Sequence, residues 1–482
     1  MSTSPADLPR ARLVFPALRW RRGSFAHEAS KIAAALAAGV GGFILFGGTR
    51  AAVTELTRAL RVRARRPLLI GADLERGAAQ QVRGLTEFPP PAVLGFLDDR
   101  DGTYAAATAT ATEARAVGLN WVFAPVCDLD IEPRNPIVQT RAFGSDPARV
   151  AAHAAAWVRG CQEHGVLACA KHYPGHGRTT LDSHEVLPVV DAPAALLEET
   201  DLAPFRAAVD AGVGSVMTAH VAYPAWDPSG SAATFSKPIL DLLCDDLGFH
   251  GITVTDAFIM GGATAAQAEA LAAVAAITAG CDLVLYPTDW EAVVRALEDV
   301  PGERAATALA RYTAALDAWE RPSPVAAGVD DLALRHHQDF ADRLADRAMH
   351  LVRGAPPLLR GPFAVAIVDD DVGGPYMIPP RDVFHGTLRA RGVRLVPARR
   401  PGGASRVVLV YAEPRSWKGR ADLGARSRAA LERLVPGAAL VVLFAHPRLV
   451  AQIPGDAPVL CAWHGQALLQ RAAARWVAAH GA

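Results

Sequence analysis

The amino-acid sequence predicts an α/β protein in which a parallel (β/α)8 barrel is followed by a smaller α/β sandwich domain. Two observations predict the barrel: short apolar runs alternate with alanine-rich helical stretches, and eight such runs occur before residue 290. A third observation predicts the second domain, because a new and shorter strand-helix series begins after Leu316. A chain of 482 residues is also too long for one compact core.

The predicted barrel strands are almost continuously apolar, as is typical of strands buried on both faces of a parallel sheet. Eight strand-helix units favour closure into a barrel; an open doubly wound sheet is the alternative, because it needs no closure at eight. The eight runs are Leu13–Pro16, Gly42–Phe46, Pro67–Gly71, Trp121–Ala124, Val166–Ala170, Gly214–Thr218, Ile252–Thr255 and Leu283–Tyr286. The helical patterns between them include Phe25–Ala38, Tyr104–Val117 and Ala148–His164.

The predicted domains meet at a proline-containing segment. Arg321–Gly328 has the sequence RPSPVAAG, which is typical of a linker, and a helical pattern follows over Leu332–Arg353. We therefore divide the chain into a barrel (1–320), a linker (321–335) and a C-terminal α/β domain (336–482). The second domain's predicted strands are Phe363–Val368, Arg406–Tyr411, Leu440–Phe444 and Val459–Trp463, and its predicted helices are Ser427–Leu434 and Leu468–Ala479.

Composition argues against several classes of function. Lys plus Arg and Asp plus Glu both number 49, so no overall field attracts nucleic acid or anionic lipid. No apolar run reaches the length of a membrane span, and MSTSPADLPRARLVF at the start lacks the pattern of a secretory signal. The six cysteines lie scattered in apolar contexts without a CxxC pair. We therefore expect a cytoplasmic protein without nucleic-acid or membrane partners, and with neither a metal nor an organic cofactor.

Polar residues follow five of the predicted barrel strands. The carboxyl ends of the strands form the functional face of such a barrel, so these side chains are expected to converge there. Any one of them can instead cap the helix that follows, but five strand ends together indicate a site. In chain order the residues are Asp73 and Glu75, Asp128, Lys171 and His172, His220, and Asp256.

Two features indicate acid–base chemistry. Asp256 ends a β-branched strand, so its carboxylate is expected in the barrel mouth as a nucleophile or electrostatic stabiliser, with a structural ion pair as the alternative. Asp182 and His184 stand two residues apart in a segment that we expect to be extended, where their side chains share one side and can form a hydrogen bond. Such a bond would prepare His184 for proton transfer; a surface pair is the alternative.

A metal site is a further alternative for the loop after the fifth strand. His172 and His176 have the four-residue spacing of a helical metal pair, but Pro174 and Gly175 between them disfavour a helix. No cysteine or carboxylate cluster accompanies them, so we expect no zinc. The glycines instead indicate a sharp turn, with His176 shaping the loop.

Several motifs, in order, resemble one enzyme family. KHYPGHG at Lys171–Gly177, followed by Asp182-Ser-His184, closely resembles the signature of the β-N-acetylhexosaminidases of glycoside hydrolase family 3. The similarity extends over GLNWVFAPVCD, which ends at Asp128, RAFGSD, which begins at Arg141, and GFHGITVTD, which ends at Asp256. It therefore spans most of residues 65–290.

The resemblance implies a retaining double displacement on a β-linked amino sugar. Asp256 would attack the anomeric carbon and form a glycosyl-enzyme intermediate. His184, paired with Asp182, would protonate the leaving oxygen and then activate water. The positions that bind the glycone in the family map onto Asp73, Arg141, Lys171 and His172, with Arg83 as a further contact.

The chain departs from the family pattern in two places. Many members have Asp-x-Glu-Gly-Gly-Arg after the third strand, whereas this chain has DLERGAAQQVR from Asp73 to Arg83, so the arginine is displaced. Family β-glucosidases can draw a glutamate acid/base from a C-terminal domain. Glu413 is a candidate for that role, but because the Asp182–His184 pair is present we expect Glu413 to be a surface residue.

The leading hypothesis is an exo-acting β-N-acetylglucosaminidase that hydrolyses terminal β-linked N-acetylglucosamine from small glycans or cell-wall fragments, as a monomer or homodimer. A family 3 β-glucosidase or phosphorylase with broad glycone tolerance is the alternative, since a histidine that has lost its proton is neutral and can stand beside an anionic acceptor. A catalytically silent sugar-binding protein is the third, and the dyad disfavours it because binding alone needs no acid–base pair.

Overall fold

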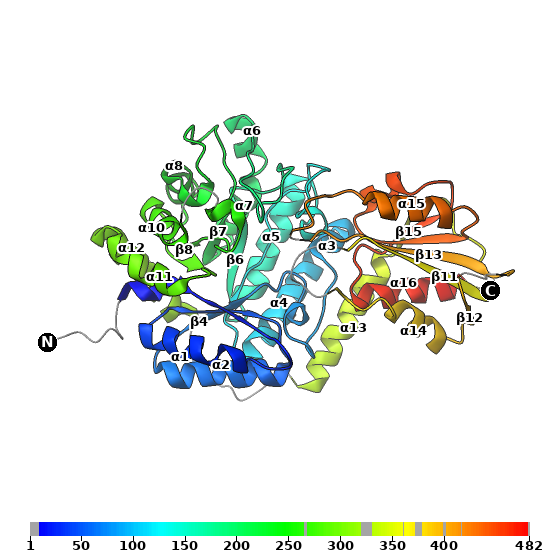
Figure 1. Ribbon diagram of the computed structural model, residues 1–482, viewed down its shortest axis with the longest axis horizontal. Helices are drawn as coiled ribbons and strands as arrows, with labels where there is room; N and C mark the ends of the chain where they lie inside the picture. Colours follow the sequence, from blue (N-terminus) through cyan, green and yellow to red (C-terminus); the bar gives the residue numbers. More distant parts are fainter. Residues whose placement is uncertain are drawn as a thin grey trace.

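Two sheets organise the molecule, and they lie side by side along its long axis (Figure 1). The structure is a computed structural model that describes residues 9–264, 268–319, 330–359, 361–371, 378–398, 402–415 and 417–480. The predicted linker sequence, Arg321–Gly328, lies outside the described residues.

The first sheet is parallel and closes into a barrel. Seven neighbouring strands run in sequence order from β2 to β8. Closure comes from β9 (Val284–Leu285), which pairs with β1 (Val14–Phe15), while Leu283 bridges Val254 of β8 and β1 leads into β2 through Pro16. The other strands are β2 (Ala17–Arg19), β3 (Gly42–Phe46), β4 (Leu69–Ala72), β5 (Trp121–Val122), β6 (Leu167–Tyr173), β7 (Ser215–Thr218) and β8 (Ile252–Val254).

The predicted barrel is confirmed, and the open doubly wound sheet is wrong. Each predicted run overlaps an observed strand, because residues buried on both faces of a sheet must be apolar along their whole length, whereas β2 was not predicted. Close packing also fixes one glycine: a Cβ on Gly42 would lie 1.7 Å from the carbonyl oxygen of Leu69 on the neighbouring strand. The barrel therefore requires glycine at this position.

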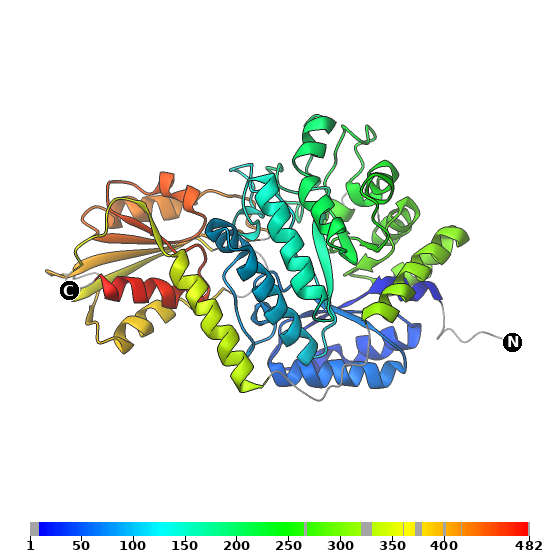
Figure 2. The ribbon, with the colours of Figure 1, turned by 180° about the vertical axis from the view of Figure 1, so that it is seen from behind.

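Helices surround the barrel (Figure 2). Helix α5 shows why they begin where they do, since the Asp146 carboxylate accepts a hydrogen bond of 2.7 Å from the N–H of Arg149 and Pro147 occupies the first turn. The helices of this part are α1 (Ala29–Ala38), α2 (Arg50–Ala64), α3 (Pro91–Leu97), α4 (Arg100–Ala116), α5 (Pro147–Gln162), α6 (Ala194–Glu199), α7 (Ala203–Asp210), α8 (Lys237–Asp241), α9 (Gly261–Thr264), α10 (Glu269–Ala279), α11 (Trp290–Ala296) and α12 (Gly302–Trp319). Among the helices that the structure describes, none is both long and apolar enough to span a bilayer.

The second sheet has six strands in the order β10-β15-β14-β13-β11-β12, of which only the β10–β15 pair is antiparallel. Helices α14 and α16 lie on one side of it and α15 on the other (Figure 1). The strands are β10 (His350–Arg353), β11 (Phe363–Asp369), β12 (Leu395–Val396), β13 (Ser405–Tyr411), β14 (Leu440–Phe444) and β15 (Val459–Cys461). The helices are α13 (Asp331–Ala348), α14 (Val383–Ala390), α15 (Ala425–Leu434) and α16 (Ala467–Ala479).

The four strands and two helices predicted for this domain overlap observed elements, whereas β10, β12 and α14 were not predicted. The helix predicted over Leu332–Arg353 ends at Ala348, because the last residues, His350–Arg353, pair as a strand with β15. Helix α13 also crosses residue 336, where we placed the start of the second domain, so the domain limits remain our proposal.

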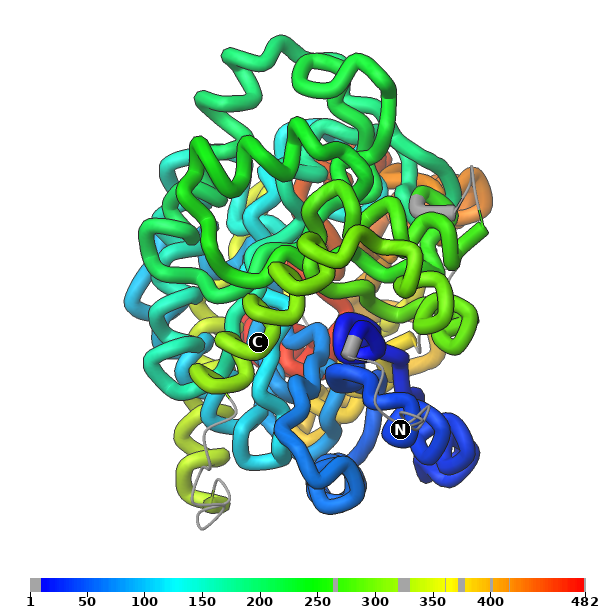
Figure 3. The backbone as a smooth tube through the Cα atoms, turned by 90° about the vertical axis from the view of Figure 1, so that its left-hand side faces the viewer, coloured from blue at the N-terminus to red at the C-terminus, as the bar shows by residue number. Residues whose placement is uncertain are grey.

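Helix α13 contacts both parts of the molecule. His337 Nδ1 lies 2.7 Å from Glu113 Oε1 on α4, while Asp342 lies 3.0 Å from Arg475 on α16. Viewed from the barrel end, the C-terminal domain lies behind the barrel (Figure 3). A second connection is made by Asp130, after β5, which is paired with Arg448 of the C-terminal domain. These contacts hold the two sheets against each other beside the barrel mouth.

Candidate active site

A cavity of about 510 Å³ opens at the carboxyl ends of the barrel strands. Seven of the eight residues predicted for the site line it, and the eighth, Asp182, is hydrogen-bonded to His184 directly behind the wall. The seven are Asp73, Arg83, Arg141, Lys171, His172, His184 and Asp256. The C-terminal domain adds a second wall, which includes Glu413, Arg415, Trp417 and His464.

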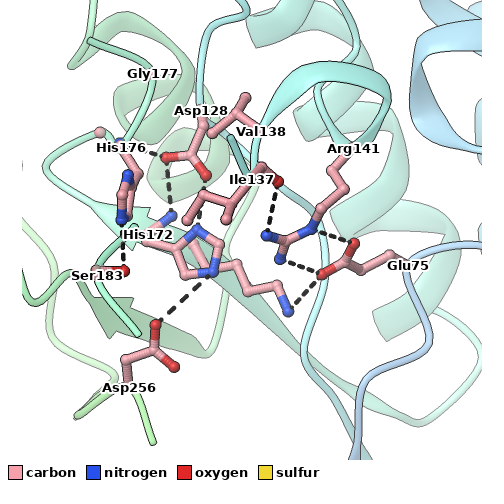
Figure 4. A network of polar contacts seen from close by, with 12 residues as sticks. Glu75, Asp128, Ile137, Val138, Arg141, His172, His176, Gly177, Ser183 and Asp256 are labelled. Carbon is pink, nitrogen blue, oxygen red and sulfur yellow. Dashed lines mark hydrogen bonds and ion pairs between the residues drawn. The ribbon is translucent and has the colours of Figure 1, made fainter. Parts of the chain in front are cut away.

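Four charged side chains form a connected cluster at the ends of β4 and β6. Lys171 is 2% exposed, and its Nζ lies 2.7 Å from Asp73 Oδ1 and 2.8 Å from Glu75 Oε1. Arg141 donates two hydrogen bonds to Glu75, of 3.0 and 2.7 Å (Figure 4). Burial opposes ionisation, but Arg141 and Lys171 outweigh it and hold the pKa of Glu75 well below its usual value. Glu75 is therefore a carboxylate at neutral pH, and Asp73, whose side chain is 31% exposed, is accessible to a ligand.

A second series of contacts links a buried carboxylate to Asp256. Asp128 is fully buried; its Oδ2 lies 2.7 Å from His172 Nδ1, and its Oδ1 accepts the main-chain N–H of His176. Because an ionised carboxylate only accepts, His172 Nδ1 holds the proton, and Nε2 faces Asp256 Oδ2 at 4.0 Å (Figure 4). Burial raises the pKa of Asp256, but the nearby imidazoles, His172 foremost, and the N–H of Ala257 lower it below its usual value. Asp256 is therefore a carboxylate at neutral pH.

Asp182 and His184 form the hydrogen-bonded pair that we expected, but in a different local structure. Asp182 Oδ1 lies 2.7 Å from His184 Nδ1 and accepts the main-chain N–H of His184 at 2.9 Å. The expected extended segment is wrong: the N–H groups of Glu185 and Val186 both donate to the carbonyl of Asp182, which closes a turn. Burial opposes ionisation of Asp182, but His184 and the N–H of Trp417 keep its pKa below the ordinary value.

His176 stabilises this loop through contacts of its ring with two side chains of the loop. Its buried ring lies between two hydroxyls, with Nε2 2.8 Å from Ser183 Oγ and Nδ1 2.8 Å from Thr179 Oγ1. Burial lowers the pKa of His176 to about 4, so the ring is neutral. Both ring nitrogens are used within the loop, which fits the loop-shaping place that we expected. Within the described part of the chain, no three His, Cys, Asp or Glu side chains gather as metal ligands.

Two arginines occupy the cavity wall near β4. Arg83 is exposed, and its main chain pairs with Gly48 beside β3, so the displacement of this arginine along the sequence still leaves it on the cavity wall. Arg76, which was not predicted as a site residue, also lines the cavity, and its Nη1 lies 2.9 Å from Glu87 Oε1. Both arginines therefore belong to the wall of the same cavity as Asp256.

Glu413 is not a surface residue, contrary to our expectation. It is 4% exposed and lines the cavity, with Oε1 accepting the N–H of Gly465 and Oε2 lying 3.4 Å from His464 Nε2. Burial, together with the neighbouring Asp371 carboxylate, raises the pKa of Glu413 to about 8. The expectation failed because only tertiary packing brings this loop of the second domain to the barrel.

Trp417, on the same loop, was not predicted either. Its main-chain N–H donates to Asp182 Oδ2 at 2.7 Å, and its indole lies against the His184 ring with 4.5 Å between ring centroids. No motif pointed to it, because Asp182, to which it donates, is 235 positions away in the sequence. The pair that we predicted therefore has a third neighbour from the other domain.

Fold and site together define a glycoside hydrolase: a (β/α)8 barrel whose mouth holds an ionised carboxylate, a hydrogen-bonded His–Asp pair and charged groups suited to sugar hydroxyls. The family model of the glycosyl hydrolase family 3 N-terminal domain matches residues 15–310, and the chain belongs to this family. The resemblance seen in the motifs is thereby confirmed.

Relatives and solved structures agree with this assignment. A β-hexosaminidase of Chromobacterium violaceum is 41% identical over 299 residues, which are 58% of this chain and 83% of that protein. A β-N-acetylglucosaminidase/β-glucosidase of Cellulomonas fimi is 37% identical over 257 residues, 51% of this chain and 46% of that protein. The structure of a family 3 β-N-acetylglucosaminidase from Paenibacillus sp. FPU-7 matches with a TM-score of 0.87 and 28% identity, covering 99% of this chain and 97% of that chain.

Proposed function

We propose that the protein is a retaining, exo-acting β-N-acetylglucosaminidase that hydrolyses terminal β-linked N-acetylglucosamine from small glycans or cell-wall fragments. The observation that supports this most strongly is the presence of the Asp256 carboxylate and the Asp182–His184 pair around one cavity. The names of the relatives, β-hexosaminidase and β-N-acetylglucosaminidase, point to the same sugar.

In this proposal Asp256 is the nucleophile. One of its oxygens is held by the N–H of Ala257 at 2.7 Å, which leaves Oδ2 for attack on the anomeric carbon. The lowered pKa keeps the group ionised, as a nucleophile requires. As the Oδ2–carbon bond forms, the bond from the anomeric carbon to the leaving oxygen breaks.

His184 supplies and recovers the proton. Its Nδ1–H is donated to Asp182, so Nε2 is the ring nitrogen that exchanges a proton with the substrate. In the first step the imidazolium Nε2 protonates the leaving oxygen. In the second, the neutral ring takes a proton from water as the water oxygen bonds to the anomeric carbon and Asp256 leaves. Two inversions at that carbon retain its configuration.

The charged cluster binds the sugar in this proposal. Asp73, Arg141, Lys171 and His172 offer charge-assisted hydrogen bonds to hydroxyl groups, and Arg83 adds a contact from the wall. Because Glu75 holds both Arg141 and Lys171, the donors are oriented before the substrate arrives, which reduces the entropic cost of binding.

A β-glucosidase or phosphorylase of broad glycone tolerance is the second candidate. The Cellulomonas fimi relative, named as both an N-acetylglucosaminidase and a β-glucosidase, favours a tolerant glycone site. We further propose that the enzyme acts in the cytoplasm as a monomer or homodimer. All six cysteines are unpaired thiols, which suits a reducing compartment.

The test measures nitrophenol release from the 4-nitrophenyl β-glycosides of N-acetylglucosamine and glucose, with and without phosphate. We expect the N-acetylglucosaminide to be turned over with the higher kcat/KM, and Asp256→Ala to abolish turnover while ligand binding persists. Preference for glucose, or formation of a sugar phosphate, would favour the second candidate. Turnover of neither glycoside would overturn both.

A further inference from the structure

We propose that Trp417 is a positioning residue for the Asp182–His184 pair, so that the C-terminal domain completes the active site of the barrel. The inference rests on the function proposed above and assigns a role to a domain whose purpose the sequence left open. Its basis is a set of contacts that cross from one domain to the other.

The first contact fixes the carboxylate. Asp182 has two oxygens, and His184 uses Oδ1 twice, through its main-chain N–H and through Nδ1. The other oxygen, Oδ2, accepts the main-chain N–H of Trp417 at 2.7 Å. The Asp182 side chain is only 1% exposed, so the main-chain N–H of Trp417 supplies a hydrogen bond that solvent is poorly placed to supply. Trp417 therefore fixes the plane of the carboxylate, and through it the direction of the His184 ring.

The second contact fixes the imidazole. The indole of Trp417 lies 4.5 Å from the His184 ring, with 58° between the ring planes. The His184 side chain is 13% exposed, and the indole covers one of its sides. An aromatic neighbour at this distance limits rotation of the imidazole.

The backbone at Trp417 is strained in a way that this role explains. Its φ of +61° lies in the left-handed region, which favours glycine and is costly for a bulky side chain. Gly419, two residues on, has φ +67° and shows the residue type that such a conformation favours. A tryptophan in this conformation indicates that the indole is needed where it lies, against His184.

The loop that presents Trp417 is fixed to its own domain. The next residue, Lys418, has a side chain that is only 1% exposed; its Nζ lies 3.5 Å from Asp370 after β11 and donates to the carbonyl of Glu413 at 3.2 Å. A Cβ on Gly419 would lie 3.5 Å from the Glu185 carboxylate, so the two loops pack closely. The position of the dyad is therefore coupled to the docking of the C-terminal domain on the barrel.

The test uses Trp417→Gly in the full-length chain. Glycine accepts φ +61° without strain, so the variant removes the indole while relieving the backbone, and we expect its melting temperature to stay at or above that of the wild type. Two substrates are compared: N,N′-diacetylchitobiose, whose leaving sugar needs protonation, and 2,4-dinitrophenyl N-acetyl-β-glucosaminide, whose leaving group does not. Trp476→Ala, on α16 and away from the cavity, is the matched loss of an indole, and Trp417→Phe tests rescue by an aromatic ring.

We expect Trp417→Gly to lower kcat/KM for the disaccharide, which reports the first step alone, about 10- to 100-fold, because a displaced proton donor loses that much. The kcat/KM of the dinitrophenyl glycoside should stay within about threefold of the wild type, Trp417→Phe should recover part of the loss, and Trp476→Ala should match the wild type. Unchanged disaccharide turnover, or equal losses on both substrates, would overturn the positioning role while leaving the proposed function intact. A wild-type enzyme inactive on both substrates would overturn the proposed function and this inference with it.

Discussion

Glu75 is expected to be a principal support of the sugar-binding cluster, and Glu75→Gln tests this. Glutamine keeps the shape of glutamate but removes the negative charge between Arg141 and Lys171. It also places an amide N–H₂ where one oxygen accepted from these two donors. Removing the charge of one member of a buried ionic cluster lowers the free energy of unfolding by about 3–5 kcal/mol, because the remaining charges stay buried without compensation.

This cost predicts a clear shift in thermal stability. At about 2 °C per kcal/mol for a large chain, Glu75→Gln should lower the melting temperature by about 6–10 °C at neutral pH. The pKa of Glu75 is depressed in the folded state, so its contribution is complete above the ordinary glutamate pKa of 4.5 and is lost as pH falls through the folded value. The difference between wild type and variant should therefore persist at pH 5 and shrink only at strongly acidic pH.

The control is Glu132→Gln, the same substitution in a surface pair with Arg134, in which the arginine side chain is 73% exposed and the glutamate side chain 22% exposed. An exposed pair contributes about 0–1 kcal/mol, so this control should melt within about 2 °C of the wild type. Differential scanning calorimetry across pH 3–8 measures both variants. If Glu75→Gln melted together with the control at pH 7, the reasoning about the buried cluster would be refuted.

Three further outcomes follow from the structure. His184→Ala should lower kcat/KM on N,N′-diacetylchitobiose about 100-fold or more and spare kcat/KM on the dinitrophenyl glycoside, and equal losses in kcat/KM would rule out the acid role. Because the pKa of Asp256 is lowered, kcat/KM should not show an acidic decline from this group until pH falls below the ordinary aspartate value of 3.8, and a pH series with an aspartate-dependent half-loss near pH 5 would contradict this. Gly42→Ala should prevent folding, since its Cβ would meet the carbonyl of Leu69, and soluble expression with native circular dichroism would show otherwise.

Most of the barrel was predictable because each strand is buried on both faces and must be apolar throughout. Polar residues after such runs were a good guide to the barrel mouth, as at Asp256, which lines the cavity. The guide failed at His220, which is buried with its Nδ1 2.9 Å from Thr234 Oγ1 and is not among the residues that line the cavity. The turn that contains Asp182 and His184 was not predictable in this way, because Asp182 accepts hydrogen bonds from the N–H groups that follow it. Such side-chain bonds compete with extended structure and favour a turn.

Contributions from the second domain were beyond sequence reasoning. Glu413 and Trp417 reach the cavity only because the second sheet packs beside the barrel, and no local periodicity in the sequence indicates that packing. The predicted end of the helix at Arg353 was wrong for a related reason. His350–Arg353 forms a strand because it pairs with Val459–Cys461, and this contact between distant parts of the sequence overrides the helical pattern.

The central claim is that Asp256 forms a covalent bond with an N-acetylglucosaminyl group, and trapping that intermediate tests it most directly. The enzyme is incubated with a 5-fluoro N-acetylglucosaminyl fluoride, digested, and mapped by mass spectrometry. We predict one glycosyl adduct, on the peptide that contains Asp256, and a β-configured first product when turnover of an ordinary substrate is followed by NMR. An adduct on another residue, or an α-configured first product, would contradict the claim.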